Sequence, residues 1–370
     1  MLVYSDKVLS EGAFRPRYIL IDGKSIESVS SSKPVCSEQV TDLTGTYLMP
    51  GFINLDSHFV KAFPEKNKSL FSYAMKNIEY VNALSGVTTL YHSVYYSCEE
   101  EKTSFESCQK RISNIKKYSQ SPLSIIDNKI NLHFEIKSPE TIENVKTLID
   151  TCNIDLLTHD SFDKRAVSSR VKDEYIIYYM IENFALSYEA AFSALKKIRT
   201  LREESCIEEL SYLIKIAHGK KIKLSTKFIG LLEKITTGFK DSFDILLADK
   251  EFLDVKTNAS HYLAIKSDDV LAMTDDKLKQ LLSGTDKMFL YAGTRPNSLS
   301  FAVFKIAEIT GFARAVSFIT SKVADALELE NAGTIKENMP ANIAAVRIVG
   351  ECPVVVYTIF EGKKAISVNL

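Results

Sequence analysis

The feature that most constrains the fold is a regular alternation of short apolar runs with helix-like segments between about residues 50 and 320. Strands that alternate with helices predict a parallel sheet covered by helices. Eight such units predict a closed (β/α)8 barrel of the TIM type. The eight runs are 51–55, 88–94, 130–136, 154–157, 222–225, 243–247, 252–255 and 288–292.

The two ends of the chain have a different pattern, in which short strands follow one another directly. Asp22-Gly23 marks the turn of a hairpin near the start, and three further strands, 341–349, 353–360 and 364–370, are expected at the end. We expect residues 1–49 and 330–370 to form one small composite β-sandwich domain. Residues 50–329 then form the barrel, with a helical insertion at about 171–219.

Composition and charge exclude several classes of partner. The chain has 370 residues and a net charge of -1, which predicts neither a nucleic-acid-binding surface nor an anionic-membrane patch. No apolar run approaches the roughly 20 residues that span a bilayer, and the first ten residues lack the apolar core of a signal peptide. Six cysteines without a Cys-x-x-Cys pair indicate reduced thiols. We therefore expect a cytoplasmic protein.

Polar residues follow the first predicted barrel strand, at the end where barrels build their active sites. Asp56 and His58 are two residues apart on an extended segment, so their side chains point the same way. A carboxylate and an imidazole placed like this can share one metal ion. The alternative is an ordinary polar loop or helix cap.

The next three predicted strands also end in titratable residues. These are His92, Glu135 and His159, and His133 precedes Glu135 by two positions. Each histidine alone could be a buried, hydrogen-bonded structural residue. Four strand ends in succession with His, Asp or Glu favour a polar site at the barrel mouth.

The chain resembles the amidohydrolase superfamily at both ends. The segment 42–54 contains Met49-Pro50-Gly51, which is similar to the passage from the small β domain into the first barrel strand of that superfamily. The segment 324–346 is similar to the return from the last helix. Within the superfamily, the segments 51–58, 131–140, 156–161 and 258–265 resemble the α-D-ribose 1-methylphosphonate 5-triphosphate diphosphatases of phosphonate metabolism, in the carbon–phosphorus lyase pathway.

This resemblance implies a metal-dependent hydrolase with a small anionic substrate, for which a phosphorylated compound is one candidate. The implied ligands of a divalent ion, zinc and one ion rather than two, are Asp56, His58, Glu135 and His159. His261 is implied to lie near the substrate phosphates, and His92 is a further candidate for substrate binding. The resemblance also implies a homodimer.

Two positions depart from the superfamily pattern. Thr226 stands where the fifth strand has a metal-binding histidine, and Gly293 where the eighth has an aspartate that binds metal and activates water. Lys227 and Arg295 lie nearby, and could bind an anion or point to solvent. An alternative function is therefore a catalytically degenerate barrel that binds a ligand or partner without turnover. A third is a structural oligomer built through residues 171–219.

Overall fold

The structure is a computed structural model of the 370-residue chain. It describes the ranges 1–57, 68–96, 104–134, 139–159, 187–193, 206–226, 243–248, 261–293 and 295–368, together with the single residues 177 and 181. His58, Glu135, Lys227 and the predicted strand 252–255 lie outside these residues. So does most of the predicted insertion, of which α7 (Cys206–Gly219) forms the described end.

The central element is an eight-stranded parallel sheet whose spatial order follows the chain. The first and last strands approach each other, because the backbone N–H of Ala292 donates to Asn54 Oδ1 over 3.1 Å. This architecture confirms the predicted (β/α)8 barrel. Its strands are β6 (Phe52–Ser57), β7 (Val87–Tyr96), β8 (Asp127–Phe134), β9 (Leu156–His159), β10 (Lys223–Thr226), β11 (Ile245–Ala248), β12 (Tyr262–Lys266) and β13 (Met288–Tyr291).

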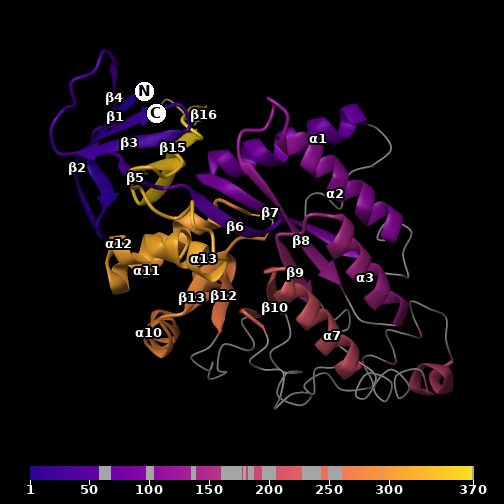
Figure 1. The fold of residues 1–370 in the computed structure, drawn as a ribbon. Helices are drawn as coiled ribbons and strands as arrows, with labels where there is room; N and C mark the ends of the chain where they lie inside the picture. Colours follow the sequence, from indigo (N-terminus) through magenta and orange to yellow (C-terminus); the bar gives the residue numbers. More distant parts are fainter. Residues whose placement is uncertain are drawn as a thin grey trace.

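Helices alternate with the barrel strands and cover their outer faces (Figure 1). Side chains of the strands and helices meet in one large apolar cluster, while a second cluster fills the interior of the barrel. No helix among the described residues is long and apolar enough to cross a membrane. Besides α7, the helices are α1 (Lys68–Leu84), α2 (Phe105–Ser119), α3 (Pro139–Thr151), α9 (Ser267–Ala272), α10 (Asp275–Gly284), α11 (Ser298–Thr310), α12 (Phe312–Ser317) and α13 (Ser321–Ala326).

Both ends of the chain contribute to a second, mixed sheet, and the N- and C-termini lie close together beside it (Figure 1). Its strand order is β16-β15-β14-β5-β1-β2-β3, with β4 paired to β1. Hydrogen bonds between β5 and β14 join the two chain ends. The strands are β1 (Leu2–Ser10), β2 (Ala13–Asp22), β3 (Ser25–Ser30), β4 (Val40–Asp42), β5 (Tyr47–Pro50), β14 (Ile343–Val349), β15 (Cys352–Phe360) and β16 (Lys363–Ser367).

The mixed sheet is held against the barrel by aromatic side chains and a close backbone approach. Phe312 of α12 stacks on Phe14 at 5.1 Å and meets Tyr47 edge to face at 4.7 Å. At the passage between the sheets, a Cβ atom added to Gly51 would overlap the side chain of Thr88. The glycine of the Met-Pro-Gly segment is therefore required because no other residue fits between β5 and β7.

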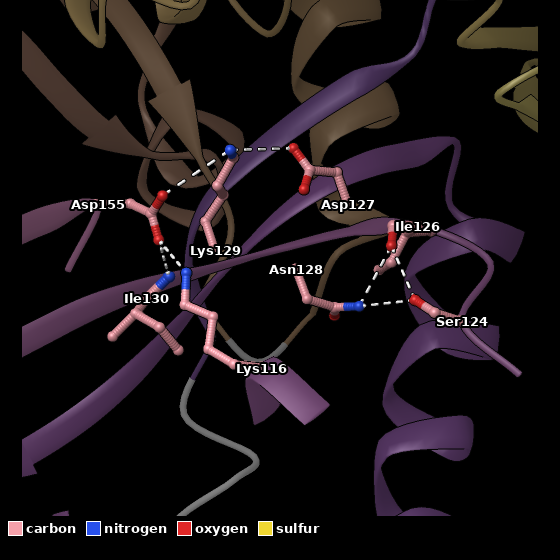
Figure 2. A network of polar contacts seen from close by, with 8 residues as sticks. All are labelled: Lys116, Ser124, Ile126, Asp127, Asn128, Lys129, Ile130 and Asp155. Atoms are coloured by element: carbon pink, nitrogen blue, oxygen red, sulfur yellow. Dashed lines mark hydrogen bonds and ion pairs between the residues drawn. The ribbon is translucent and has the colours of Figure 1, made fainter. Parts of the chain in front are cut away.

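Two aspartates at the start of barrel strands fasten neighbouring strands together. The Asp155 backbone N–H donates to the carbonyl of Ile130, and its carboxylate accepts from the N–H of Ile130 at 2.8 Å. Asp244 bonds to Leu224 in the same two ways. Figure 2 shows that Lys116 and Lys129 converge on the Asp155 carboxylate, at 3.1 and 3.8 Å.

The Asp155→Ala variant is expected to lower the free energy of unfolding by about 2–3 kcal/mol. The substitution leaves a backbone N–H in the sheet without its acceptor and removes a partner of two lysines. Urea denaturation followed by circular dichroism would measure the loss, since the chain has no tryptophan. Glu143→Ala is the control, because this 69% exposed carboxylate makes only a surface pair with Lys146 and should change stability by less than about 0.5 kcal/mol. Equal stability of the two variants would contradict the role of Asp155.

The main difference from the sequence analysis concerns the seventh barrel strand. The structure forms it from Tyr262–Lys266, whereas the sequence pattern predicted 252–255. Phe252-Leu-Asp-Val and Tyr262-Leu-Ala-Ile are both short apolar runs, and apolar periodicity alone does not decide which of them forms the seventh strand. The shift changes the end of the barrel at which His261 lies.

Candidate functional site

A layer of polar side chains lies inside the barrel toward the carboxyl ends of its first strands. Apolar residues such as Ile53, Leu156 and Phe289 fill the interior elsewhere. The polar layer consists of fully buried side chains from five different strands, namely Asp56, Ser93, Asn131, His133, Thr158 and Ser225. Because active sites of such barrels are built at this end, the polar layer is the candidate site.

Asp56 reaches this layer because β6 is irregular. Ile53 and Leu55 belong to the interior cluster, so strict alternation would turn Asp56 outward. The pairing of β6 with β7 shifts register between Asn54 and Ser57. The Asp56 carboxylate accordingly accepts a short hydrogen bond from the Ser93 hydroxyl of β7.

His133 of β8 stands beside Asp56. Its Nε2 atom lies 3.7 Å from Asp56 Oδ1, and both side chains are almost completely buried. The ring of Tyr95 packs against the His133 ring with centroids 4.5 Å apart. An aspartate and a histidine are thus held side by side from two strands that are not neighbours in the sheet.

A chain of hydrogen bonds forms the rest of the polar layer. Asn131 donates from Nδ2 to the backbone carbonyl of Leu55 and accepts from the Thr158 hydroxyl at 2.7 Å. The Thr158 and Ser225 hydroxyls are 2.6 Å apart. These bonds tie β6, β8, β9 and β10 together and satisfy the buried polar groups below the site.

The side chain of His159 extends from β9 on the face opposite to that of Thr158. Its ring lies 5.4 Å from the ring of Phe134, a residue of the cluster between barrel and helices. The described contacts therefore bring Asp56 to His133, which the predicted ligand set did not include, and not to His159. The predicted ligands His58 and Glu135 lie outside the described residues, as does Lys227.

His92 lies on the outer face of β7, away from the polar layer. Its Nε2 atom is 2.7 Å from Asn128 Oδ1, and Asn128 in turn bonds to Glu79 of α1. Burial lowers the pKa of His92 to about 4, although the Asn128 contact opposes this shift. These contacts give His92 a structural role, and none of them supports the predicted role in substrate binding.

His261 lies at the opposite end of the barrel from the polar layer. It immediately precedes β12, and its Nδ1 atom is 2.7 Å from the carbonyl of Phe243, which precedes β11. The residue therefore belongs to the amino ends of the strands. Its predicted position near substrate phosphates assumed that it followed the seventh strand, and the observed position of that strand removes this assumption.

The remaining predicted positions lie at the ends of β10 and β13. Thr226 is buried at the end of β10, and Gly293 follows β13. Arg295 is 70% exposed and pairs with Asp268 at 3.2 Å.

Within the described ranges, no group of three or more His, Cys, Asp or Glu side chains could hold a metal ion. The two donors that do meet, Asp56 and His133, are of types that zinc accepts.

Sequence reasoning missed Ser93 and did not assign a role to His133. His133 gave a signal, because it alternates with Glu135 on one strand. Ser93 gave none, because a serine within a strand has no distinctive pattern and only the neighbouring strand supplies its partner. The irregular register of β6 likewise has no mark in the sequence.

Comparison with known proteins reveals likeness in structure and none in sequence. No protein-family model matches the chain, and no curated protein sequence matches it. A dihydropyrimidinase from Brevibacillus agri is 12% identical, with a TM-score of 0.60 over 99% of this chain and 95% of its own. The N-acetylglucosamine-6-phosphate deacetylases of Mycobacterium smegmatis and Pasteurella multocida are 12% and 13% identical, each with a TM-score of 0.62 over 99% of this chain and 100% of theirs.

These proteins are members of the amidohydrolase superfamily, and the likeness extends over nearly the whole of each chain. At such low identity it concerns the fold. The chain has the amidohydrolase type of fold, a parallel eight-stranded barrel joined to a mixed sheet that both termini build.

Proposed function

We propose that the chain is a metal-dependent hydrolase that acts on a small anionic substrate. The observation that carries this proposal is the buried Asp56 carboxylate at the end of the first barrel strand, with the His133 imidazole 3.7 Å away. A carboxylate fully buried in a barrel interior is costly unless it is paired or holds a cation. The solved structures with the same fold include a dihydropyrimidinase and a triazine hydrolase, both named for hydrolytic activities.

In this proposal one divalent ion, zinc by preference, is held by Asp56 together with the predicted ligands His58 and Glu135, and the predicted ligand His159 is left out because its ring lies against Phe134 on the other side of β9. Bound zinc would supply Lewis acidity toward the reacting bond and toward water. Ser93 orients the Asp56 carboxylate through its hydrogen bond. Such partners of metal ligands fix their geometry. The hydrogen-bonded side chains of Asn131, Thr158 and Ser225 lie in the same interior layer as this pair.

The substrate in this proposal carries negative charge, which Lys227 and Arg295 would bind. Arg295 already contacts Asp268, but a guanidinium has five N–H donors and can serve a carboxylate and a substrate anion together. Within this class, the motif resemblance points to the diphosphatases of phosphonate metabolism, so ribose phosphonate triphosphates are the first compounds to test. We further propose a cytoplasmic homodimer.

Metal content tests this proposal. Protein purified without chelators is expected to contain about one zinc ion per chain, and Asp56→Asn should weaken zinc binding by about 100-fold or more. Asparagine keeps the size of the side chain and an oxygen for Ser93, but loses the charge that attracts the ion. Equilibrium dialysis with zinc measures the affinity, and His218→Gln is the control because this exposed histidine precedes β10 and lies at the amino ends of the strands, opposite the polar layer. Wild-type protein that binds no added zinc would contradict the proposal.

A second candidate is a barrel that binds an anion without turnover. It is favoured by Thr226 and Gly293, because a threonine hydroxyl does not act as a base at neutral pH and glycine has no side chain to do so. The two candidates differ in a direct measurement. Zinc-loaded protein that binds a phosphate ester and does not hydrolyse it would support the silent barrel, and release of phosphate or diphosphate would support the enzyme.

A further inference from the structure

We propose that His133 is a direct metal ligand that shares the ion with Asp56, in a chain whose fifth barrel strand ends in Thr226 and offers no imidazole. This inference rests on the proposed function and adds a residue to its site. Thr226 stands at the fifth-strand position, and a threonine hydroxyl is a poor substitute for an imidazole as a zinc ligand. His133 supplies an imidazole from the third strand to the interior layer that contains Asp56.

The separation of the two donor atoms fits a shared ion. Asp56 Oδ1 and His133 Nε2 lie 3.7 Å apart, which is too far for a hydrogen bond. Two ligand atoms on one tetrahedral zinc ion, each about 2.1 Å from the metal, are roughly 3.4 Å apart. A small opening of the angle at the metal accommodates the observed distance, so neither side chain needs to change rotamer.

The register of the strands places His133 in one row with the interior residues of the two following strands. His133 pairs with Thr158 of β9, and Thr158 pairs with Ser225 of β10, the residue before Thr226. The hydroxyls of Thr158 and Ser225 bond to each other and to Asn131. In this row of described residues, His133 is the one that carries a nitrogen donor suited to zinc.

Both proposed ligands are held by neighbouring side chains in the manner of metal ligands. Ser93 donates to the Asp56 carboxylate, and Tyr95 packs against the His133 ring at 4.5 Å. A hydrogen bond such as that from Ser93 fixes the orientation of a metal ligand and raises metal affinity, and the packing of Tyr95 limits rotation of the His133 ring. The alternative role for His133 is a purely structural one, in which it packs beside Asp56 without contacting the ion.

Zinc affinity and the count of imidazole ligands distinguish these roles. We expect His133→Ala and His133→Gln to weaken zinc binding by about 100-fold, while His218→Gln stays within about threefold of wild type. Glutamine retains much of the packing against Tyr95, and thermal unfolding checks that both variants fold. X-ray absorption of zinc-loaded protein should detect one imidazole fewer in the His133 variants than in wild type.

The outcomes separate this inference from the proposed function. Wild-type protein that binds no zinc would overturn both. Zinc bound with unchanged affinity, or with weaker affinity and an unchanged number of imidazole ligands, would overturn the ligand role of His133 while the hydrolase proposal stands. Lower affinity together with the loss of one imidazole would support the inference.

Discussion

Replacing Glu79 with alanine is expected to lower the free energy of unfolding by about 4 kcal/mol. The Glu79 carboxylate is fully buried in α1 and accepts four hydrogen bonds, from Tyr118, Ser124, Asn128 and the backbone of Ile125, at 2.7 to 3.2 Å. Its loss leaves these donors buried without a partner, and removing one member of a buried charged network typically costs about 3–5 kcal/mol. Urea denaturation followed by circular dichroism measures the change.

Two comparisons identify the cause of this effect. Glu79→Gln keeps one acceptor oxygen, so we expect roughly half of the loss. Tyr118→Phe removes only one of the four donors, and should cost about 1 kcal/mol. Burial and the adjacent Glu79 carboxylate raise the pKa of the Tyr118 hydroxyl, so this donor keeps its proton at neutral pH. A Glu79→Ala protein as stable as Tyr118→Phe would refute the network as a major source of stability.

The second large effect is an acid sensitivity that His92 confers. Burial lowers the pKa of His92 from its ordinary value of 6.5 to about 4 in the folded protein. Between these two pH values the unfolded chain binds the extra proton, so the free energy of unfolding falls as the pH falls. The difference in pKa corresponds to about 3 kcal/mol, which is present above pH 6.5 and lost by about pH 4.

The test compares the wild type with His92→Gln, in which the amide can still donate to Asn128. Other groups also titrate in this range, so the informative quantity is the difference in unfolding free energy between the two proteins at each pH. That difference should move by about 3 kcal/mol in favour of the variant between pH 7 and pH 4. Parallel pH profiles for the two proteins would mean that His92 is not protonated differently on folding.

His92 and Ser93 show that the phase of a strand, meaning which of its residues face the barrel interior, limits prediction from the sequence. His92 was a candidate for the site because it lies near the end of a barrel strand. On β7, however, Ser93 faces the interior and bonds to Asp56, so His92 faces Asn128 on the outer side. Alternation fixes that one residue of each adjacent pair enters the barrel, but the sequence alone does not say which one.

A second limit on predicting the site is the position of a residue relative to the ends of its strand. His261 precedes β12 and lies at the amino end of the barrel, because the seventh strand begins one residue later and not nine residues earlier. A functional site needs the carboxyl ends, so an error in a single strand moved a residue from one end of the molecule to the other. Asp56 was placed correctly at its strand end, but it enters the interior through a register shift that has no sequence signal.

The sequence by itself determined the architecture of this protein. Seven of the eight apolar runs became barrel strands, and the strands of both termini met in one mixed sheet. Local patterns carry this information because apolar periodicity, turns and strand length act on neighbouring residues. The tertiary structure alone decided which polar side chains meet. Asp56, Ser93 and His133 come from three strands, and their proximity depends on register, strand phase and barrel closure, which are properties of the folded chain as a whole.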